Sequence, residues 1–270
     1  MIRIEDLHKT FNAGTINEVY ALRGINFSVN EGEFVTVIGT NGSGKSTLLN
    51  AIAGSFLPDA GRIEISETDV TRRKDYYRAK YIARVFQNPF MGTAPDMSIA
   101  ENLLISHLRG KARYPKVSLH KELMKAFSEK IQYLEMDLED RLDNVIGSLS
   151  GGQRQAITLL MAVLEKPKVL LLDEHTAALD PKSAAQVIKL TKKFVEEDKL
   201  TAVMVTHSMQ QALELGNRTI MMHGGKIIEN ISESEKLRMT TDDFLSRFSE
   251  IRKREKLNDE LITQLRQEYC

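Results

Sequence analysis

Residues 34–47 read FVTVIGTNGSGKST, a short apolar run followed at once by a glycine-rich turn. The turn matches the phosphate loop G-x-x-x-x-G-K-[ST]. Its glycines let backbone N–H groups turn inward around phosphate oxygens, and a helix that starts near Gly44 points its positive end at the same anion. The residues expected to bind the nucleotide here are Gly39, Asn41, Gly42, Ser43, Gly44, Lys45, Ser46 and Thr47.

Two side chains of this turn predict a phosphate chemistry that needs a metal ion. Lys45 supplies a positive charge for the β- and γ-phosphates of ATP. Ser46 offers a hydroxyl oxygen, the kind of ligand that Mg²⁺ accepts while it keeps several of its waters. The predicted cofactors are therefore ATP and Mg²⁺.

Four short apolar runs are each followed by a glycine or a polar residue that could take part in binding or catalysis. Residues 34–38, 81–86, 169–172 and 202–205 lead into Gly39, Gln87, Asp173 and Thr206-His207. Runs of this kind with little alternation are typical of strands buried on both faces, as in a parallel sheet. Ligands of such sheets bind beyond the carboxyl ends of the strands, so the four positions are expected at one edge.

Two acids follow the third run. Asp173 is expected to hold the water shell of Mg²⁺, and Glu174 to polarise the attacking water. Phosphoryl transfer needs this division of labour, because its catalysis is mostly positioning and neutralisation of charge.

A second glycine-rich helix start lies at residues 149–153, LSGGQ. A hydroxyl and free N–H groups at a helix start suit an anion. One ATP needs only one phosphate loop, so this segment is expected to face the nucleotide of another subunit. Its expected contacts are Ser150, Gly151, Gly152 and Gln153.

The remaining segments predict the domain organisation. Residues 2–31 and 62–65 contain short alternating pieces that suit an antiparallel sheet, and residues 92–145 are expected to form a helical insertion. Helices are expected from Ser98 to about Leu108 and from Leu119 to about Glu135, and also after the caps Ser150 and Asp180. With the helix after Ser150 included, the inserted subdomain spans about 92–165 of a cassette at 1–230, and residues 231–270 form a charged, helical extension.

Composition excludes several classes of protein. Lys+Arg and Asp+Glu are both 37, so no basic field indicates nucleic acid as a partner. The one cysteine cannot form an internal disulfide. No stretch approaches the roughly 18–20 apolar residues of a membrane-spanning helix, and the first residues lack a signal-peptide core. We therefore expect a cytoplasmic chain.

Over residues 1 to about 230, the chain resembles the ATP-binding subunit of an ABC transporter. The resemblance rests on the order and spacing of the phosphate loop, Gln87, LSGGQ, Asp173-Glu174, Asp180 and His207. The resemblance implies an α/β cassette with a RecA-like parallel-sheet core, an N-terminal antiparallel β subdomain and an inserted helical subdomain. It also implies a head-to-tail homodimer that sandwiches two ATP molecules. It assigns Gln87 to Mg²⁺ and to sensing the membrane subunit, Asp180 to cross-dimer communication, and His207 to the γ-phosphate.

The resemblance also implies an aromatic ring stacked on adenine. Phe11 is the first candidate and Tyr20 the second, since stacking needs only a π face. One departure is His175, where many relatives carry proline; a histidine there can change the local backbone or add a titrating group.

The Glu-His-Thr sequence at residues 174–176, together with MGTAP at residues 91–95, resembles a bacterial importer branch. Members of that branch pair with a branched-chain-type permease and a solute-binding lipoprotein, and some are associated with aromatic amino acids. The chain would then be a peripheral protein at the cytoplasmic face of the membrane, held by the permease. Two alternatives stay open: a soluble ATPase of iron–sulfur cluster assembly, and the ATPase of an exporter. A coiled-coil DNA-repair ATPase is rejected because only about 80 residues separate Gln87 from Glu174.

Overall fold

The computed structural model describes residues 1–111, 119–244, 246–247 and 250. Its largest sheet has six strands in the order β10-β9-β3-β8-β7-β6, and every neighbouring pair from β9 to β6 is parallel. These strands are β3 (Phe34–Gly39), β6 (Ile82–Val85), β7 (Val169–Asp173), β8 (Ala202–Val205), β9 (Arg218–His223) and β10 (Lys226–Ile231). The four apolar runs are confirmed as neighbours in one parallel sheet.

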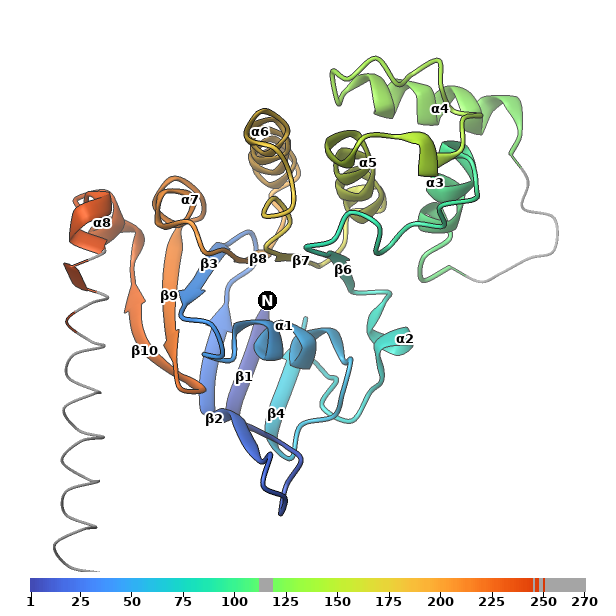
Figure 1. The fold of residues 1–270 in the computed structure, drawn as a ribbon. Helices are drawn as coiled ribbons and strands as arrows, with labels where there is room; N and C mark the ends of the chain where they lie inside the picture. Colours follow the sequence, from blue (N-terminus) through green and yellow to red (C-terminus); the bar gives the residue numbers. More distant parts are fainter. Residues whose placement is uncertain (112–118, 245, 248–249, 251–270) are drawn as a thin grey trace, which may run out of the picture.

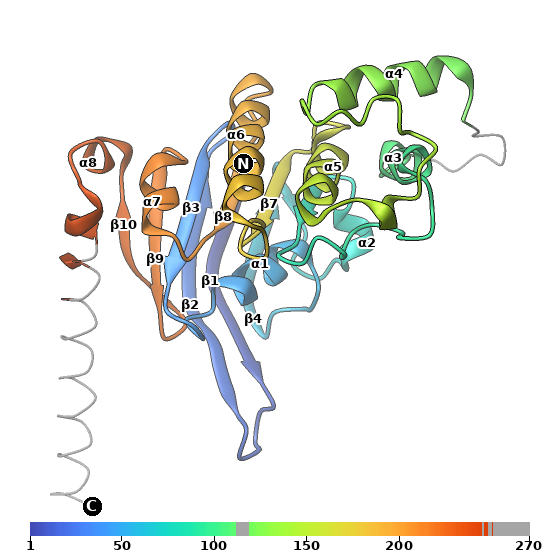
Figure 2. The same cartoon turned by 45° about the horizontal axis from the view of Figure 1, so that its top comes forward.

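A second sheet is antiparallel and has the order β2-β1-β4-β5. Its strands are β1 (Ile2–Phe11), β2 (Val19–Val29), β4 (Ala60–Ile65) and β5 (Thr68–Asp69). Figure 2 shows the β1–β2 hairpin extending beyond the rest of this sheet. The short alternating pieces are therefore confirmed as an antiparallel sheet.

The helices fall into two groups around the parallel sheet (Figure 1). Helices α5, α6 and α7 cover one face, α1 lies between the two sheets, and α3 and α4 lie beside α5. Their bounds are α1 (Lys45–Ala53), α2 (Asp75–Arg78), α3 (Ile99–His107), α4 (Lys121–Gln132), α5 (Gly151–Val163), α6 (Pro181–Glu197), α7 (Met209–Glu214) and α8 (Glu233–Lys236), with a short 3₁₀ turn η1 (Ile146–Ser148).

Alternate residues of the parallel strands enter two different cores. In β7, Leu170 and Leu172 contact the helical layer, whereas Val169 and Leu171 contact α1 and the antiparallel sheet. All four side chains are fully buried. Burial on both faces explains why this strand reads as an unbroken apolar run rather than as an alternating one.

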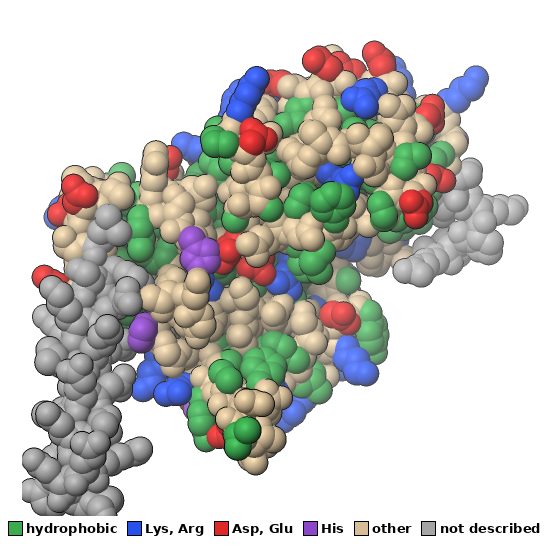
Figure 3. Space-filling model, in the orientation of Figure 1, with side chains coloured by type: hydrophobic (Ala, Val, Ile, Leu, Met, Phe, Trp, Pro, Cys, Tyr) green, Lys and Arg blue, Asp and Glu red, His purple; other side chains and the backbone are tan. Residues whose placement is uncertain are grey.

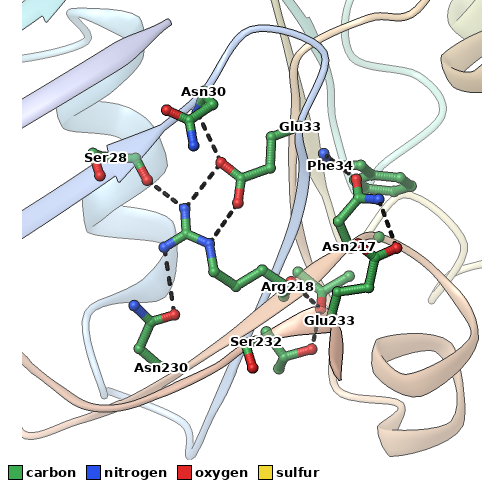
Figure 4. Close-up of polar contacts among 12 residues, drawn as sticks. Ser28, Asn30, Glu33, Phe34, Asn217, Arg218, Asn230, Ser232 and Glu233 are labelled. Atoms are coloured by element: carbon green, nitrogen blue, oxygen red, sulfur yellow. Dashed lines mark hydrogen bonds and ion pairs between the residues drawn. The ribbon is translucent and has the colours of Figure 1, made fainter. Parts of the chain in front are cut away.

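Polar contacts hold the start of β3, the end of the strand that lies opposite the phosphate loop (Figure 4). Arg218 of β9 donates from Nε to Glu33 Oε1 at 2.6 Å. Asn217 accepts from the Phe34 N–H at 3.0 Å and donates to Glu233 at 3.2 Å. These contacts join β3, β9 and α8, so the strand that carries the phosphate loop is fixed at its far end.

The segment beyond residue 231 packs on the sheet as far as it is described. Phe244 is fully buried against Ile38, Met221 and Ile231. Of the predicted helical extension, residues 245, 248–249 and 251–270 lie outside the described residues. Within the described ranges, no helix is both long enough and apolar enough to cross a lipid bilayer.

Candidate functional site

The parallel pairing places Gly39 and Asp173 at the carboxyl ends of β3 and β7, with Glu174 and His207 just beyond β7 and β8. A cavity of about 380 Å³ opens at this edge. It is lined by Phe11, Val19, Ala21, residues 41–47, Glu174 and His207. On the face drawn in Figure 3, histidine, acidic and basic side chains meet near the middle, between the helices and the antiparallel sheet.

Two glycines of the loop are required by close approach of other backbone. A Cβ on Gly39 would lie 2.3 Å from Met222 O, and a Cβ on Gly44 would lie 2.5 Å from Ala21 O. Gly44 also adopts φ 98°, which L side chains rarely do, and is the N-cap of α1. The N-terminus of α1 is therefore directed at the cavity, where its free N–H groups suit an anion.

Lys45 is a buried cation of the loop. Its side chain is 5% exposed, and Nζ donates to Gly39 O and Thr40 O, both at 3.0 Å. Burial lowers the pKa of Lys45, and the nearby Glu174 and Asp173 carboxylates oppose that shift. The positive charge is thus already held within the loop.

The loop also holds oxygen atoms that suit a phosphate and a hard cation. Ser43 Oγ is buried and has no hydrogen-bond partner among the described residues. Ser46 Oγ lies 3.4 Å from Asp173 Oδ1. A hydroxyl beside a carboxylate is the donor set that Mg²⁺ prefers, and the unpartnered Ser43 hydroxyl can donate to a phosphate oxygen.

Arg84 of β6 was not anticipated from the sequence. Its guanidinium donates to Asp173 Oδ2 and to Asn50 Oδ1 of α1, each at 2.6 Å. The Asp173 carboxylate therefore has one oxygen on Arg84 and the other toward Ser46. The signal in the sequence is a single arginine within a buried apolar strand, a position that usually implies a buried partner.

Glu174 and His207 form the second polar pair. Glu174 Oε1 lies 2.6 Å from His207 Nε2, and the Glu174 side chain is only 12% exposed. Glu174 has φ 46°, in the left-handed region, and its N–H donates to Val205 O of β8 at 3.0 Å. A non-glycine residue in this region costs free energy and is retained where the surroundings enforce it.

Three predicted site elements lie apart from this cavity. Gln87 is exposed just beyond β6 and does not line the cavity. Ser150 is an exposed N-cap whose Oγ accepts from Gln153 N at 3.3 Å, with Gln153 completing a capping box. Asp180 is the N-cap of α6 and accepts from Ser183 N at 3.0 Å, and hydrogen bonds from Ser183 lower its pKa.

The two candidates for adenine stacking differ in position. Phe11 lines the cavity, with its ring edge-on to Phe56 at 5.4 Å between centroids. Tyr20 is 54% exposed, lies beside Arg23 and does not line the cavity. This arrangement favours Phe11.

His175 turns away from the cavity into the protein interior. It is 2% exposed, and its Nε2 lies 2.9 Å from Thr191 Oγ1 of α6. Burial lowers the pKa of His175 to about 4, so the ring is neutral at neutral pH. The departure from proline therefore adds an anchor to α6 rather than a charge at the site.

The fold and this edge define a class of protein: a nucleotide-hydrolysing α/β cassette. Comparison with known proteins gives the family. Residues 22–177 match the model of the ABC transporter family. The tyrosine transport ATP-binding protein of Clostridioides difficile is 40% identical over 250 residues, which are 92% of this chain and 98% of that protein. The phosphate import ATP-binding protein PstB of Aeropyrum pernix is 34% identical, over 79% of this chain and 85% of that protein.

Solved structures agree with these relatives. A dimeric ATP-binding cassette in a post-hydrolysis state, bound to ADP and Pi, superposes with a TM-score of 0.73 at 31% identity. The match covers 86% of this chain and 99% of that one. The chain belongs to the ABC transporter family and is an ATP-binding, ATP-hydrolysing subunit of the importer type. This confirms the resemblance, the fold class and the enzyme prediction, and it favours neither alternative.

Proposed function

We propose that this chain hydrolyses ATP with Mg²⁺ at the edge formed by the phosphate loop, Asp173, Glu174 and His207. Lys45 and the loop N–H groups bind the β- and γ-phosphates, and Phe11 stacks on adenine. Ser46, Asp173 and Gln87 hold the metal ion, which neutralises phosphate charge. Glu174 polarises the attacking water, and His207, whose Nε2 lies 2.6 Å from Glu174 Oε1, contacts the γ-phosphate. The paired carboxylates beside a buried lysine are the observation that carries this assignment.

The site is completed by a second copy of the chain. Ser150–Gln153 lie at an exposed helix start, outside the cavity of their own chain. A head-to-tail homodimer brings this segment onto the partner's ATP, where the serine hydroxyl and the helix N-terminus meet the γ-phosphate. Asp180 then faces the dimer interface. The dimeric cassette structure at 31% identity supports this arrangement.

We further divide the chain into a cassette, residues 1–230, with an inserted helical subdomain at about 92–165, and an extension, residues 231–270. A groove of about 1000 Å³ between the core and the insertion is lined by Tyr76, Tyr77, Lys80, Ile105 and Arg109, among others. A short helix of a membrane permease fits a groove with apolar and cationic walls. The chain then sits at the cytoplasmic face of the membrane through that permease.

The transported solute is an amino acid, with tyrosine or a similar aromatic compound as the candidate. The support is the match of nearly full length to a tyrosine transport ATP-binding protein. The permease and an extracytoplasmic solute-binding protein would contact and select the solute.

Uptake measurements in the native host test this proposal. A strain that lacks the chain should lose uptake of radiolabelled tyrosine, and the unaltered chain should restore it. Glu174→Gln should not restore it, although the variant is still expected to bind ATP. Normal tyrosine uptake in the deletion strain, with loss of uptake of another solute, would reject the proposed substrate and retain the ATPase.

Purification of the tagged chain from detergent-solubilised membranes tests the partners. A polytopic permease should co-purify, and Ile105→Asp in the groove should release it while the ATPase activity of the free chain is retained. A soluble scaffold as the main partner, with no membrane protein, would contradict the proposed location.

A further inference from the structure

Gln155 is a buried amide on α5, two residues beyond the LSGGQ segment. The residue is fully buried, and its Nε2 donates to two backbone carbonyls: Phe86 O at 3.0 Å and His175 O at 2.7 Å. Phe86 immediately precedes Gln87, and His175 immediately follows Glu174. One side chain of α5 thus holds the loops that follow both β6 and β7.

The orientation of this amide has a cost that the two bonds offset. The Gln155 oxygen, Oε1, is buried without a hydrogen-bond partner among the described residues. A buried acceptor without a partner is unfavourable, and one in a native fold calls for an explanation. Here the explanation is geometric: both amide hydrogens are directed at loop carbonyls, and the oxygen occupies the remaining direction.

The turn that Gln155 holds is the one that carries Glu174. The backbone of Glu174 is in the left-handed region at φ 46°, where an L side chain is strained. Such a conformation persists only where neighbouring contacts enforce it. Gln155 fixes the carbonyl directly after Glu174, and the His175 ring is fixed in turn by Thr191 at 2.9 Å.

We propose that Gln155 is a positioning residue for hydrolysis, which acts by holding the Glu174 turn. This inference rests on the catalytic role given to Glu174 above. The amide keeps the Glu174 carboxylate at 2.6 Å from His207, and it links α5 to the turn that carries Glu174. Displacement of a reacting group by about 1 Å can cost on the order of a hundredfold in rate.

Gln155→Met is the first variant, because methionine has a similar length and no donor. The kcat for ATP hydrolysis should fall by about tenfold to a hundredfold, while the KM for ATP stays within about twofold. Thr158→Val is the matched control: it lies one turn further along α5, is buried, and donates only to Arg154 O of its own helix at 2.8 Å. Its kcat should stay within about twofold of the unaltered chain.

A double-mutant cycle with Glu174→Gln separates positioning from a general loss of structure. If Gln155 acts through Glu174, adding Gln155→Met to Glu174→Gln should change the residual rate by less than about twofold. A loss in the double variant equal to that in the single variant would overturn the proposal, as would a normal kcat for Gln155→Met. Should Gln155→Met fail to fold, Gln155→Asn, which retains the amide but cannot span both carbonyls, takes its place in the same cycle.

The cycle also tells two failures apart. If Glu174→Gln hydrolyses ATP at the normal rate, the role of Glu174 under the proposed function is wrong, whatever Gln155 does. If Glu174→Gln is inactive and Gln155→Met is normal, only the positioning role is wrong.

Discussion

Lys45 shows how a single side chain prepares the site for an anion. Its ammonium group is buried and is held by two carbonyls of its own loop, with Asp173 and Glu174 near enough to oppose the effect of burial on its pKa. A charge that is already positioned loses little entropy when phosphate arrives, so more of the interaction energy contributes to binding.

Replacement of Lys45 by alanine should therefore remove most of the affinity for ATP. A hydrogen bond to a charged group contributes about 1.5–3 kcal/mol, so the dissociation constant should rise by roughly tenfold to a hundredfold. Titration calorimetry measures the change. Lys192→Ala, an exposed lysine of α6, is the control, and equal affinities for both variants would contradict the phosphate-loop assignment.

His175 gives the protein a specific sensitivity to acid. Burial lowers its pKa to about 4 in the folded state, against the ordinary value of 6.5 in the unfolded chain. Below pH 6.5 the unfolded chain therefore binds a proton that the folded chain does not. Stability from this group is complete above pH 6.5 and falls by about 1.4 kcal/mol per pH unit down to about pH 4.

His175→Asn should remove this acid-dependent loss, which amounts to about 3 kcal/mol in total. The variant starts from lower stability because a buried ring is lost, so the slopes are to be compared and not the absolute values. Urea unfolding between pH 7 and pH 4 measures both curves. Parallel curves for the two proteins would mean that His175 is not the titrating group.

At the scale of the element, α1 has two differently specialised ends. Its N-terminus begins at Gly44 and faces the nucleotide cavity. Its C-terminus ends at Gly54, in the left-handed conformation, and its last carbonyls accept from the buried Arg78 guanidinium: Ala51 O at 2.7 Å and Ile52 O at 2.8 Å. The N–H groups at the first end are free because a helix offers them no internal partner, and the other end is anchored by a side chain from α2.

Arg78→Met should lower the free energy of unfolding by about 2–4 kcal/mol. The substitution keeps apolar bulk but removes the guanidinium that donates to the buried carbonyls of Ala51 and Ile52. Urea denaturation measures the change, and Arg72→Met, an exposed neighbour, should stay within about 0.5 kcal/mol of the unaltered chain. A loss below 1 kcal/mol for Arg78→Met would show that the cap is dispensable.

The sequence predicts the elements that carry the site better than the contacts between them. Asp173 and His207 could be placed at one edge because short, unbroken apolar runs predict a parallel sheet. The carboxyl ends of the strands in such a sheet share one edge. Arg84 and Gln155 could not be assigned, since their partners are 89 and 20 residues away. Strands β9 and β10 were also not anticipated, because β9 (RTIMMH) carries only a three-residue apolar run and β10 (KIIENI) mixes apolar with polar residues.

At the scale of the whole molecule, the LSGGQ segment lies apart from the cavity of its own chain. Ser150 and Gly151 are exposed and line no part of the cavity that Lys45 and Glu174 share. In the head-to-tail dimer proposed above, a second chain supplies them, and dimerisation buries these two exposed residues in the same event. ATP is then part of the interface, so dimerisation and nucleotide binding stabilise each other.

Glu174→Gln should therefore collect as a dimer when ATP is present. Light scattering after size exclusion should give twice the 30.5 kDa of the chain with ATP and a single chain mass without it. Adding Ser150→Arg should return the protein to the monomer mass, because the larger, charged side chain clashes at the dimer interface. ATP binding by the single chain should be retained. A monomer at saturating ATP in Glu174→Gln would contradict the sandwich arrangement.

The left-handed backbone at Glu174 implies a conflict between durability and turnover. A non-glycine residue there costs roughly 1–2 kcal/mol, a noticeable share of the net stability of about 5–15 kcal/mol that is usual for a folded domain. Selection for thermal robustness alone would favour glycine or asparagine at this position, and either would remove the carboxylate. When variants are selected for stability alone, substitutions of residue 174 should be an early cause of lost ATPase activity. Engineering for heat resistance therefore has to keep residue 174 unchanged.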